Sequence, residues 1–272
     1  MSSSLTHMKW QYAALTDRGR LRRRNEDALL ALPGRRLFAV ADGMGGHAAG
    51  DVASALAVAT LDAALPRAPS ARLGAARLGA RLRAAFQAAH EAILEQSSRQ
   101  PEQAGMGTTL TALVPLRATP ACVIAHLGDS RAYRLRDGRL AQLTHDHTWV
   151  QQQVDAGKLT APQARSHPWA SVLTRVLGGG EPGVADIVIA EVDPGDLFLL
   201  CTDGLTSVTV DAEIATLLSQ SLPLPELAQQ LVDAALLRGG PDNITVILLR
   251  ADALVAARLR PHLRAHSDPG SS

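Results

Sequence analysis

Apolar positions in the first third of the chain predict one strand and two helices. Residues 37–41 form a short apolar run that stops at Asp42-Gly43, which indicates a buried strand. Residues 48–65 are rich in Ala, Leu and Val until Pro66, which predicts a helix. Between residues 71 and 96, apolar side chains recur at helical spacing with arginines on the opposite face. That second helix is therefore amphipathic and packs on a core.

The period then changes from helical to alternating. Four short segments have the pattern of strands: residues 109–114, 122–126, 131–135 and 139–143. Asp137-Gly138 separates the last two and predicts a two-residue hairpin turn, because both central positions of that turn favour positive φ. Residues 147–157 and 161–165 are predicted to be short helices inside a polar, proline-containing excursion. Residues 145–180 are accordingly interpreted as an inserted flap.

Strands and helices in the last third occur in a mixed order. Strands are predicted at residues 186–191, 197–201 and 243–249, and helices at 211–219 and 225–237. Adjacent strands with helices inserted in pairs indicate antiparallel sheets covered by helices, not regular βαβ alternation. The predicted organisation is a flexible N-terminus at 1–8, a single domain at 9–250 and a tail at 251–272.

Composition excludes several classes of protein. The 272 residues are 46% hydrophobic, enough for a sizeable core, and 27 Lys and Arg nearly balance 26 Asp and Glu. The chain is therefore expected to bind neither nucleic acid nor membrane through a global charge. No apolar run approaches the roughly 20 residues of a membrane helix, and residues 1–8 are polar. Cys122 and Cys201 lie in apolar stretches and are expected to be reduced, which favours a cytoplasmic location.

Acidic residues recur where apolar strands end. The five sites are Asn25-Glu26-Asp27, Asp42-Gly43, Gly128-Asp129-Ser130, Thr202-Asp203-Gly204 and Pro241-Asp242-Asn243. Any one of them alone is best interpreted as a turn. Together they predict a cage for Mn²⁺ or Mg²⁺, since these hard cations prefer carboxylate and carbonyl oxygens. The arginine run at residues 20–24 directly precedes the first site and predicts a guanidinium that binds phosphate.

Other functional classes fit these residues less well. Gly43-Met44-Gly45-Gly46-His47-Ala48 fits a dinucleotide-binding fingerprint, with Asp62 near the expected acidic position. Asp62, however, lies inside a predicted helix, and Asp42 would repel a pyrophosphate. The glycines at 178–180 lack the Lys-Ser/Thr of a P-loop. A non-catalytic module that binds phosphoproteins remains the alternative to an enzyme.

The motifs resemble those of the PP2C-type (PPM) metal-dependent Ser/Thr phosphatases, particularly the compact bacterial members. The matching segments cover about 240 residues and include Thr16-Asp17-Arg18-Gly19, Val40 to His47, Gly105-Met106-Gly107-Thr108-Thr109, Gly128-Asp129-Ser130-Arg131, Thr202-Asp203-Gly204-Leu205 and Gly239 to Thr245. The resemblance implies an α+β fold, a four-layer α-β-β-α sandwich with two central antiparallel sheets. It also implies two core Mn²⁺ or Mg²⁺ ions and a third, weaker one.

The resemblance assigns a role to each candidate residue. Asp42 would bridge the core metals, Asp27 and the Gly43 carbonyl would bind one, and Asp203 with Asp242 the other. Asp129 matches the position of the third metal, and Arg22 matches the phosphate-binding arginine. Glu26 would hold a metal-bound water or lie behind the ligands, and Asn243 would lie behind them. The animal enzymes carry a histidine where Met44 stands. His47 either protonates the leaving oxygen, caps the following helix or orients a metal-bound water.

The activity that the resemblance implies is hydrolysis of phosphoserine and phosphothreonine by direct attack of a metal-activated water. The expected partners are phosphorylated Ser/Thr proteins, including a separate Ser/Thr kinase and its substrates, and the chain is expected to be a monomer. Three flap histidines, His145, His147 and His167, are expected to be exposed and solvated.

Overall fold

A computed structural model describes residues 8–45, 49–66, 73–180 and 184–253. Every strand pairing in it is antiparallel. The five-stranded sheet has the order β1 (Met8–Asp17), β11 (Ile244–Ala253), β10 (Leu197–Cys201), β7 (Arg131–Arg136) and β8 (Arg139–Gln142). The six-stranded sheet has the order β2 (Asp27–Leu32), β3 (Leu37–Met44), β5 (Leu110–Pro115), β6 (Ala121–Leu127) and β9 (Asp186–Glu191), with β4 (Gly107–Thr108) paired to β3.

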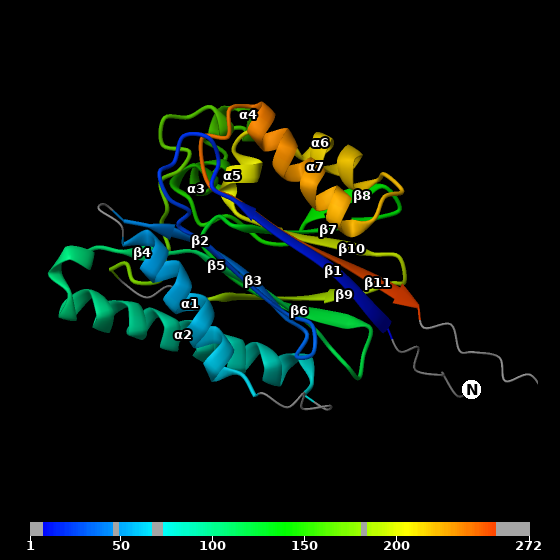
Figure 1. Ribbon diagram of the computed structural model, residues 1–272, viewed down its shortest axis with the longest axis horizontal. Helices are drawn as coiled ribbons and strands as arrows, with labels where there is room; N and C mark the ends of the chain where they lie inside the picture. Colours follow the sequence, from blue (N-terminus) through cyan, green and yellow to red (C-terminus); the bar gives the residue numbers. More distant parts are fainter. Residues whose placement is uncertain (1–7, 46–48, 67–72, 181–183, 254–272) are drawn as a thin grey trace, which may run out of the picture.

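Helices cover the outer faces of both sheets (Figure 1). Helices α1 (Gly50–Ala64) and α2 (Ala75–Arg99) lie on the six-stranded sheet, and α6 (Asp211–Leu218) and α7 (Leu224–Leu237) on the five-stranded sheet. A separate hydrophobic cluster, which includes Phe38 and Phe198, fills the space between the sheets. The predicted four-layer α-β-β-α sandwich is thereby confirmed.

Side-chain alternation along the strands builds these layers. In β10, Leu197, Leu199 and Cys201 pack under the helices. Phe198 and Leu200 of the same strand point the other way, into the space between the sheets. Because successive side chains of a strand point to opposite faces, a strand buried on both sides is an unbroken apolar run.

The predicted elements inside the sandwich have nearly their predicted bounds. Strands β9 and β10 begin and end at the predicted residues. Asp137 and Gly138 have φ of 50° and 73°, which confirms the hairpin turn between β7 and β8. The flap contains α3 (Trp149–Asp155) and α4 (Ala161–Arg165), each with a threonine cap at its N-terminus.

Strands β1 and β2 and the two-residue β4 were missed, and the ends of the domain differ from the prediction. Strands β1 and β2 lie at the edges of the sheets, where half-exposed positions blur the alternation. Met8, predicted to belong to the N-terminus, begins β1 and pairs with Ala253. Residues 251–253, predicted to belong to the tail, therefore complete β11. No helix in the described part of the chain is long and apolar enough to cross a membrane.

Candidate metal centre

Strand register brings the predicted acids together at one end of the sandwich. Asp27 of β2 lies directly opposite Asp42 of β3. The Oδ2 atom of Asp27 also accepts hydrogen bonds from the hydroxyls of Thr202, 2.8 Å away, and Thr245, 2.6 Å away. These threonines belong to the segments that carry Asp203 and Asp242. The site therefore spans the gap between the two sheets.

The carboxyl groups of Asp42 and Asp203 lie close enough to perturb each other's pKa. Burial raises the pKa of Asp42 well above its ordinary value, and the negative charges of Asp203, Asp27 and Asp129 raise it further. Burial also raises the pKa of Asp203. Among the described residues, neither carboxyl group forms an ion pair with an arginine, lysine or histidine side chain.

Burial and neighbouring negative charges also raise the pKa values of Asp27 and Asp129. Burial raises the pKa of Asp27 to about 7, although its two threonine donors oppose the shift. Burial and the charges of Asp203 and Asp146 raise the pKa of Asp129 well above its ordinary value. We call Asp27, Asp42, Asp129 and Asp203 the carboxylate cluster. Strongly perturbed acids gathered in this way are typical of functional sites.

Two glycines allow the backbone to pack closely beside these acids. A Cβ atom at Gly43 would lie 2.0 Å from the carbonyl oxygen of Gly50. A Cβ atom at Gly204 would lie 1.8 Å from the carbonyl oxygen of Asn243. No other residue fits either position without moving the backbone, so both glycines fix the geometry of the site.

One arginine of the run at residues 20–24 reaches the acids. The Nη2 atom of Arg22 donates to Oδ2 of Asp242 at 2.6 Å, and half of the Arg22 side chain remains exposed. Arg20 instead donates to the carbonyl of Leu236, and Arg24 lies 3.7 Å from Asp51. Arg22 is thus held beside the acids with a surface still open to a ligand.

Asn243 fastens the loop that carries these residues. Its Nδ2 atom donates to the carbonyls of Arg18, at 2.8 Å, and Arg24, at 2.9 Å, while its Oδ1 accepts from the backbone N–H of Glu26 at 2.7 Å. Burial raises the pKa of Glu26, and the nearby charges of Asp51 and Asp242 add to the shift. Asn243 therefore ties together the segment that holds Arg18, Arg24 and Glu26.

Hydroxyl groups that the strand-end pattern did not single out orient Asp42. Thr109 accepts from the backbone N–H of Asp42 at 2.9 Å and contacts Ser130 at 2.7 Å. Thr108 donates to the Asp42 carbonyl at 2.8 Å. Like Thr202 and Thr245, they hold an acid or its backbone in place. The signal available in the sequence was their position in or beside the quoted motifs.

The flap histidines differ from the prediction that all three are exposed. His147 is buried: its Nδ1 accepts from the N–H of Gly128, 3.0 Å away, and its Nε2 lies 3.0 Å from Asp186. Gly128 has φ of 114° and precedes Asp129, so His147 supports a strained turn of the site. His145 is exposed beside Asp155, as expected. His47 lies outside the described residues.

The dinucleotide alternative is wrong. Strand β3 and helix α1 flank the glycine-rich segment, but β3 pairs only with antiparallel neighbours, whereas that fingerprint requires a parallel sheet. Asp62 lies in α1 and forms an ion pair with Arg35. The glycines at residues 178–180, which lack the P-loop motif, lie in a backbone turn where the N–H of Gly178 donates to His90, 3.1 Å away.

The donor set fits a divalent cation. The Oδ1 atoms of Asp27 and Asp203 are buried and have no hydrogen-bond partner. A buried carboxylate oxygen without a donor is costly unless a cation binds it. Among the described residues, no three acidic, histidine or cysteine side chains converge on one point at coordinating distance. Asp27 instead accepts from two threonines, and Asp242 pairs with Arg22.

Comparisons with known proteins show the family of this chain. The family model for protein phosphatase 2C matches residues 20–238. The chain is 44% identical over 241 residues to the serine/threonine protein phosphatase PstP of Mycobacterium tuberculosis, covering 88% of this chain and 44% of that protein. It is 38% identical over 240 residues to the serine/threonine phosphatase stp of Listeria monocytogenes, covering 87% and 94%. The chain thus spans less than half the length of the PstP sequences that it matches.

Solved structures extend the similarity to the fold. The crystal structure of M. tuberculosis PstP superposes with a TM-score of 0.81 at 44% identity, covering 89% of this chain and 99% of that one. A structure of the PstP catalytic domain in complex with two manganese ions has a TM-score of 0.78 at 41% identity, covering 90% and 99%.

Proposed function

This chain belongs to the protein phosphatase 2C family, and from that premise we propose that it hydrolyses phosphoserine and phosphothreonine in proteins. The observation that carries the proposal is the carboxylate cluster, whose raised pKa values and unpartnered Oδ1 atoms call for bound cations, with Arg22 beside it. The two manganese ions of the PstP catalytic domain support the choice of metal.

In the proposed assignment, Asp42, Asp27, the Gly43 carbonyl, Asp203 and Asp242 would hold two Mn²⁺ or Mg²⁺ ions. Asp129 would hold a weaker third. Such ions, when bound, polarise a phosphoryl group and lower the pKa of a bound water. Glu26 and Asn243 support this shell from behind, as their contacts with the loop at residues 18–26 indicate.

Arg22 orients the phosphoryl group. Its guanidinium is already held by Asp242, so its planar donors are placed before a substrate arrives. The leaving seryl or threonyl oxygen needs a proton, and His47 is a candidate donor by its place in the sequence alone. The water attacks phosphorus directly, so no nucleophilic side chain is required. Both cysteines are unsuited to that role, because burial raises each thiol pKa to about 12.

The proposed substrates are a separate Ser/Thr kinase and the proteins that it phosphorylates. Two buried, unpaired thiols fit a reducing compartment, so we propose a cytoplasmic location. We also propose that the chain acts as a monomer, which light scattering would check.

Hydrolysis of a phosphothreonine peptide tests the enzyme assignment. Purified protein is assayed with Mn²⁺, with Mg²⁺ and with EDTA, and Asp203→Asn reports contaminating phosphatases. We expect turnover that needs metal and is lost in the variant. Turnover that persists in EDTA, or none with any metal, contradicts the proposal; the second result favours a module that only binds phosphoproteins.

Arg22→Ala tests phosphate binding, with Arg20→Ala as the matched control from the same run. Arg22→Ala is expected to raise KM for the peptide roughly tenfold or more, because charge-assisted contacts to the phosphoryl oxygens are lost. Arg20 contacts a backbone carbonyl away from the acids, so its variant should keep the wild-type KM. Equal effects of the two variants would mean that Arg22 has no special role.

A further inference from the structure

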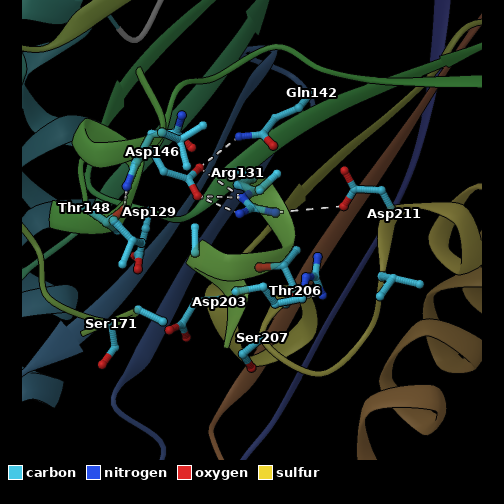
Figure 2. A pocket seen from close by; sticks show the side chains of 18 of the residues that line it. Asp129, Arg131, Gln142, Asp146, Thr148, Ser171, Asp203, Thr206, Ser207 and Asp211 are labelled. Carbon is cyan, nitrogen blue, oxygen red and sulfur yellow. Dashed lines mark hydrogen bonds and ion pairs between the residues drawn. The ribbon is translucent and has the colours of Figure 1, made fainter. Parts of the chain in front are cut away.

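A pocket of about 610 Å³ extends from the carboxylate cluster under the flap. Asp129 and Asp203 lie at one side of it, and Asp211 lies across it on the other side of Arg131 (Figure 2). Helices α3 and α4 of the flap form one wall. The opposite wall is formed by α5 (Asp203–Thr206) and the start of α6. The pocket is thus continuous with the proposed site of phosphate hydrolysis.

The two arginines that line this pocket already have hydrogen-bond partners. Arg131 donates to both carboxylate oxygens of Asp146, at 2.6 to 3.0 Å (Figure 2). It also donates to the Tyr133 hydroxyl. Arg165 donates to the carbonyl of Thr206 at 3.3 Å. Neither arginine that lines the pocket lacks a partner. Because the other charged groups of the lining are aspartates, the pocket disfavours an acidic ligand.

Apolar side chains line much of the rest. Val150 and Ala164 of the flap are buried against the pocket, and Val154 lies beside them. Val210 faces them from the start of α6 and is 47% exposed. Apolar side chains converging on a partly open space are suited to an aliphatic side chain of a ligand.

We propose that this pocket binds an uncharged, apolar side chain of the phosphorylated substrate, close in sequence to its phosphoserine or phosphothreonine. The inference rests on the proposed function, which places the phosphoryl group at the carboxylate cluster. A pocket of this volume is roughly 10 Å across, the length of about three extended residues. A side chain within three residues of the phosphorylated residue therefore reaches it. The flap thereby selects substrates by the residues that flank the phosphate.

Phosphothreonine peptides that differ at one neighbouring residue test the pocket. Leucine, asparagine or aspartate is placed in turn at each of the three positions before and after the phosphothreonine, and kcat/KM is measured. We expect leucine to exceed asparagine roughly tenfold at one position at least, with aspartate the poorest. No preference at any position, or a preference for aspartate, overturns the proposal.

Val210→Asp then assigns the preference to this pocket. Val210 is the N-cap of α6 and has no capping hydrogen bond, so aspartate or asparagine there favours the helix and keeps the fold. The leucine-to-asparagine ratio of kcat/KM should fall to near one in Val210→Asp and less far in Val210→Asn. Ile189→Asp, at an exposed apolar position of β9, should keep the wild-type ratio. An unchanged ratio in Val210→Asp overturns the proposal.

The small substrate p-nitrophenyl phosphate separates failure of the pocket from failure of the enzyme assignment. It has no neighbouring residues, so its Mn²⁺-dependent hydrolysis by the wild-type protein reports only on the metal centre. Hydrolysis of this compound without any peptide preference would overturn the pocket and leave the phosphatase assignment intact. If the protein hydrolyses neither p-nitrophenyl phosphate nor any peptide, both the pocket and the phosphatase assignment are overturned.

Discussion

Two neighbouring regions bury acidic side chains in opposite ways. In the carboxylate cluster the acids face one another, and two of their oxygens lack any donor. Two residues beyond Asp129, Arg131 forms a forked pair with Asp146, whose oxygens also receive a hydrogen bond from Gln142. A compensated pair is a structural element, whereas an uncompensated cluster destabilises the fold and is retained for what it binds.

The largest expected effect breaks the carboxylate cluster. Asp42→Asn or Asp203→Asn should lower kcat with Mn²⁺ by more than about 100-fold, the upper end for loss of a mere supporting partner. Without metal, the same variants should melt at the wild-type temperature or higher, because one repelling charge is gone. Activity assays and thermal melts in EDTA check both. Rates near wild type, or melting several degrees lower, would contradict this account.

The opposite result is expected at the compensated pair. Asp146→Ala should lower the free energy of unfolding by about 3 kcal/mol, because it leaves the largely buried Arg131 charge without its carboxylate. Urea unfolding in EDTA measures this. The control is Asp193→Ala, since Asp193 is 63% exposed in its pair with Arg136 and should cost only about 0–1 kcal/mol. Equal losses in the free energy of unfolding for Asp146→Ala and Asp193→Ala would mean that burial of the Arg131–Asp146 pair makes no difference.

A smaller change tests how the cluster is held. Thr245→Val removes a hydroxyl that donates to Asp27, and Mn²⁺ affinity measured by calorimetry should fall about tenfold. Thr209→Val is the matched control, because the Thr209 hydroxyl is equally buried but has no hydrogen-bond partner. It should leave Mn²⁺ affinity unchanged. A similar loss in both variants would mean that Asp27 does not depend on its threonine donor.

The last test concerns His126, a buried base beside the compensated pair. Burial lowers its pKa to about 4; His147 lowers it further, while Asp146 and Asp186 oppose the shift. Because the folded-state pKa lies below the unfolded one, stability is full above pH 6.5 and declines as pH falls toward 4. The loss should reach about 2 kcal/mol at pH 5. Urea unfolding at pH 7 and pH 5 measures it, and His126→Gln should show a smaller loss; an equal loss would assign the acid sensitivity elsewhere.

Much of the fold follows from local patterns. Strands β9 and β10 are apolar segments bounded by turn residues, and their predicted ends agree with the structure. Strands β1 and β2 could not be found this way, because edge strands are half exposed and owe their conformation to β11 and β3. Helix α5 was missed because Asp203-Gly204 has the pattern of a turn.

Local patterns in the sequence also predicted part of the candidate site. Five acidic segments stood out because an acid directly beside an apolar run is locally unusual. The residues that the pattern missed, such as Thr109 and His147, act through hydrogen bonds to segments far along the chain. His147 was expected to be solvated, since nothing in its own neighbourhood shows that Gly128 packs against it.

The sequence by itself determined the elements and the chemistry at their ends, because periodicity, turn preferences and residue type act over a few positions. Only the tertiary structure decided which acids are balanced. Asp129 and Asp146 both follow strands in the same stretch of chain, yet Asp146 meets Arg131 and Asp129 meets Asp203. Charge compensation depends on what distant segments bring into contact, and no local pattern contains that information.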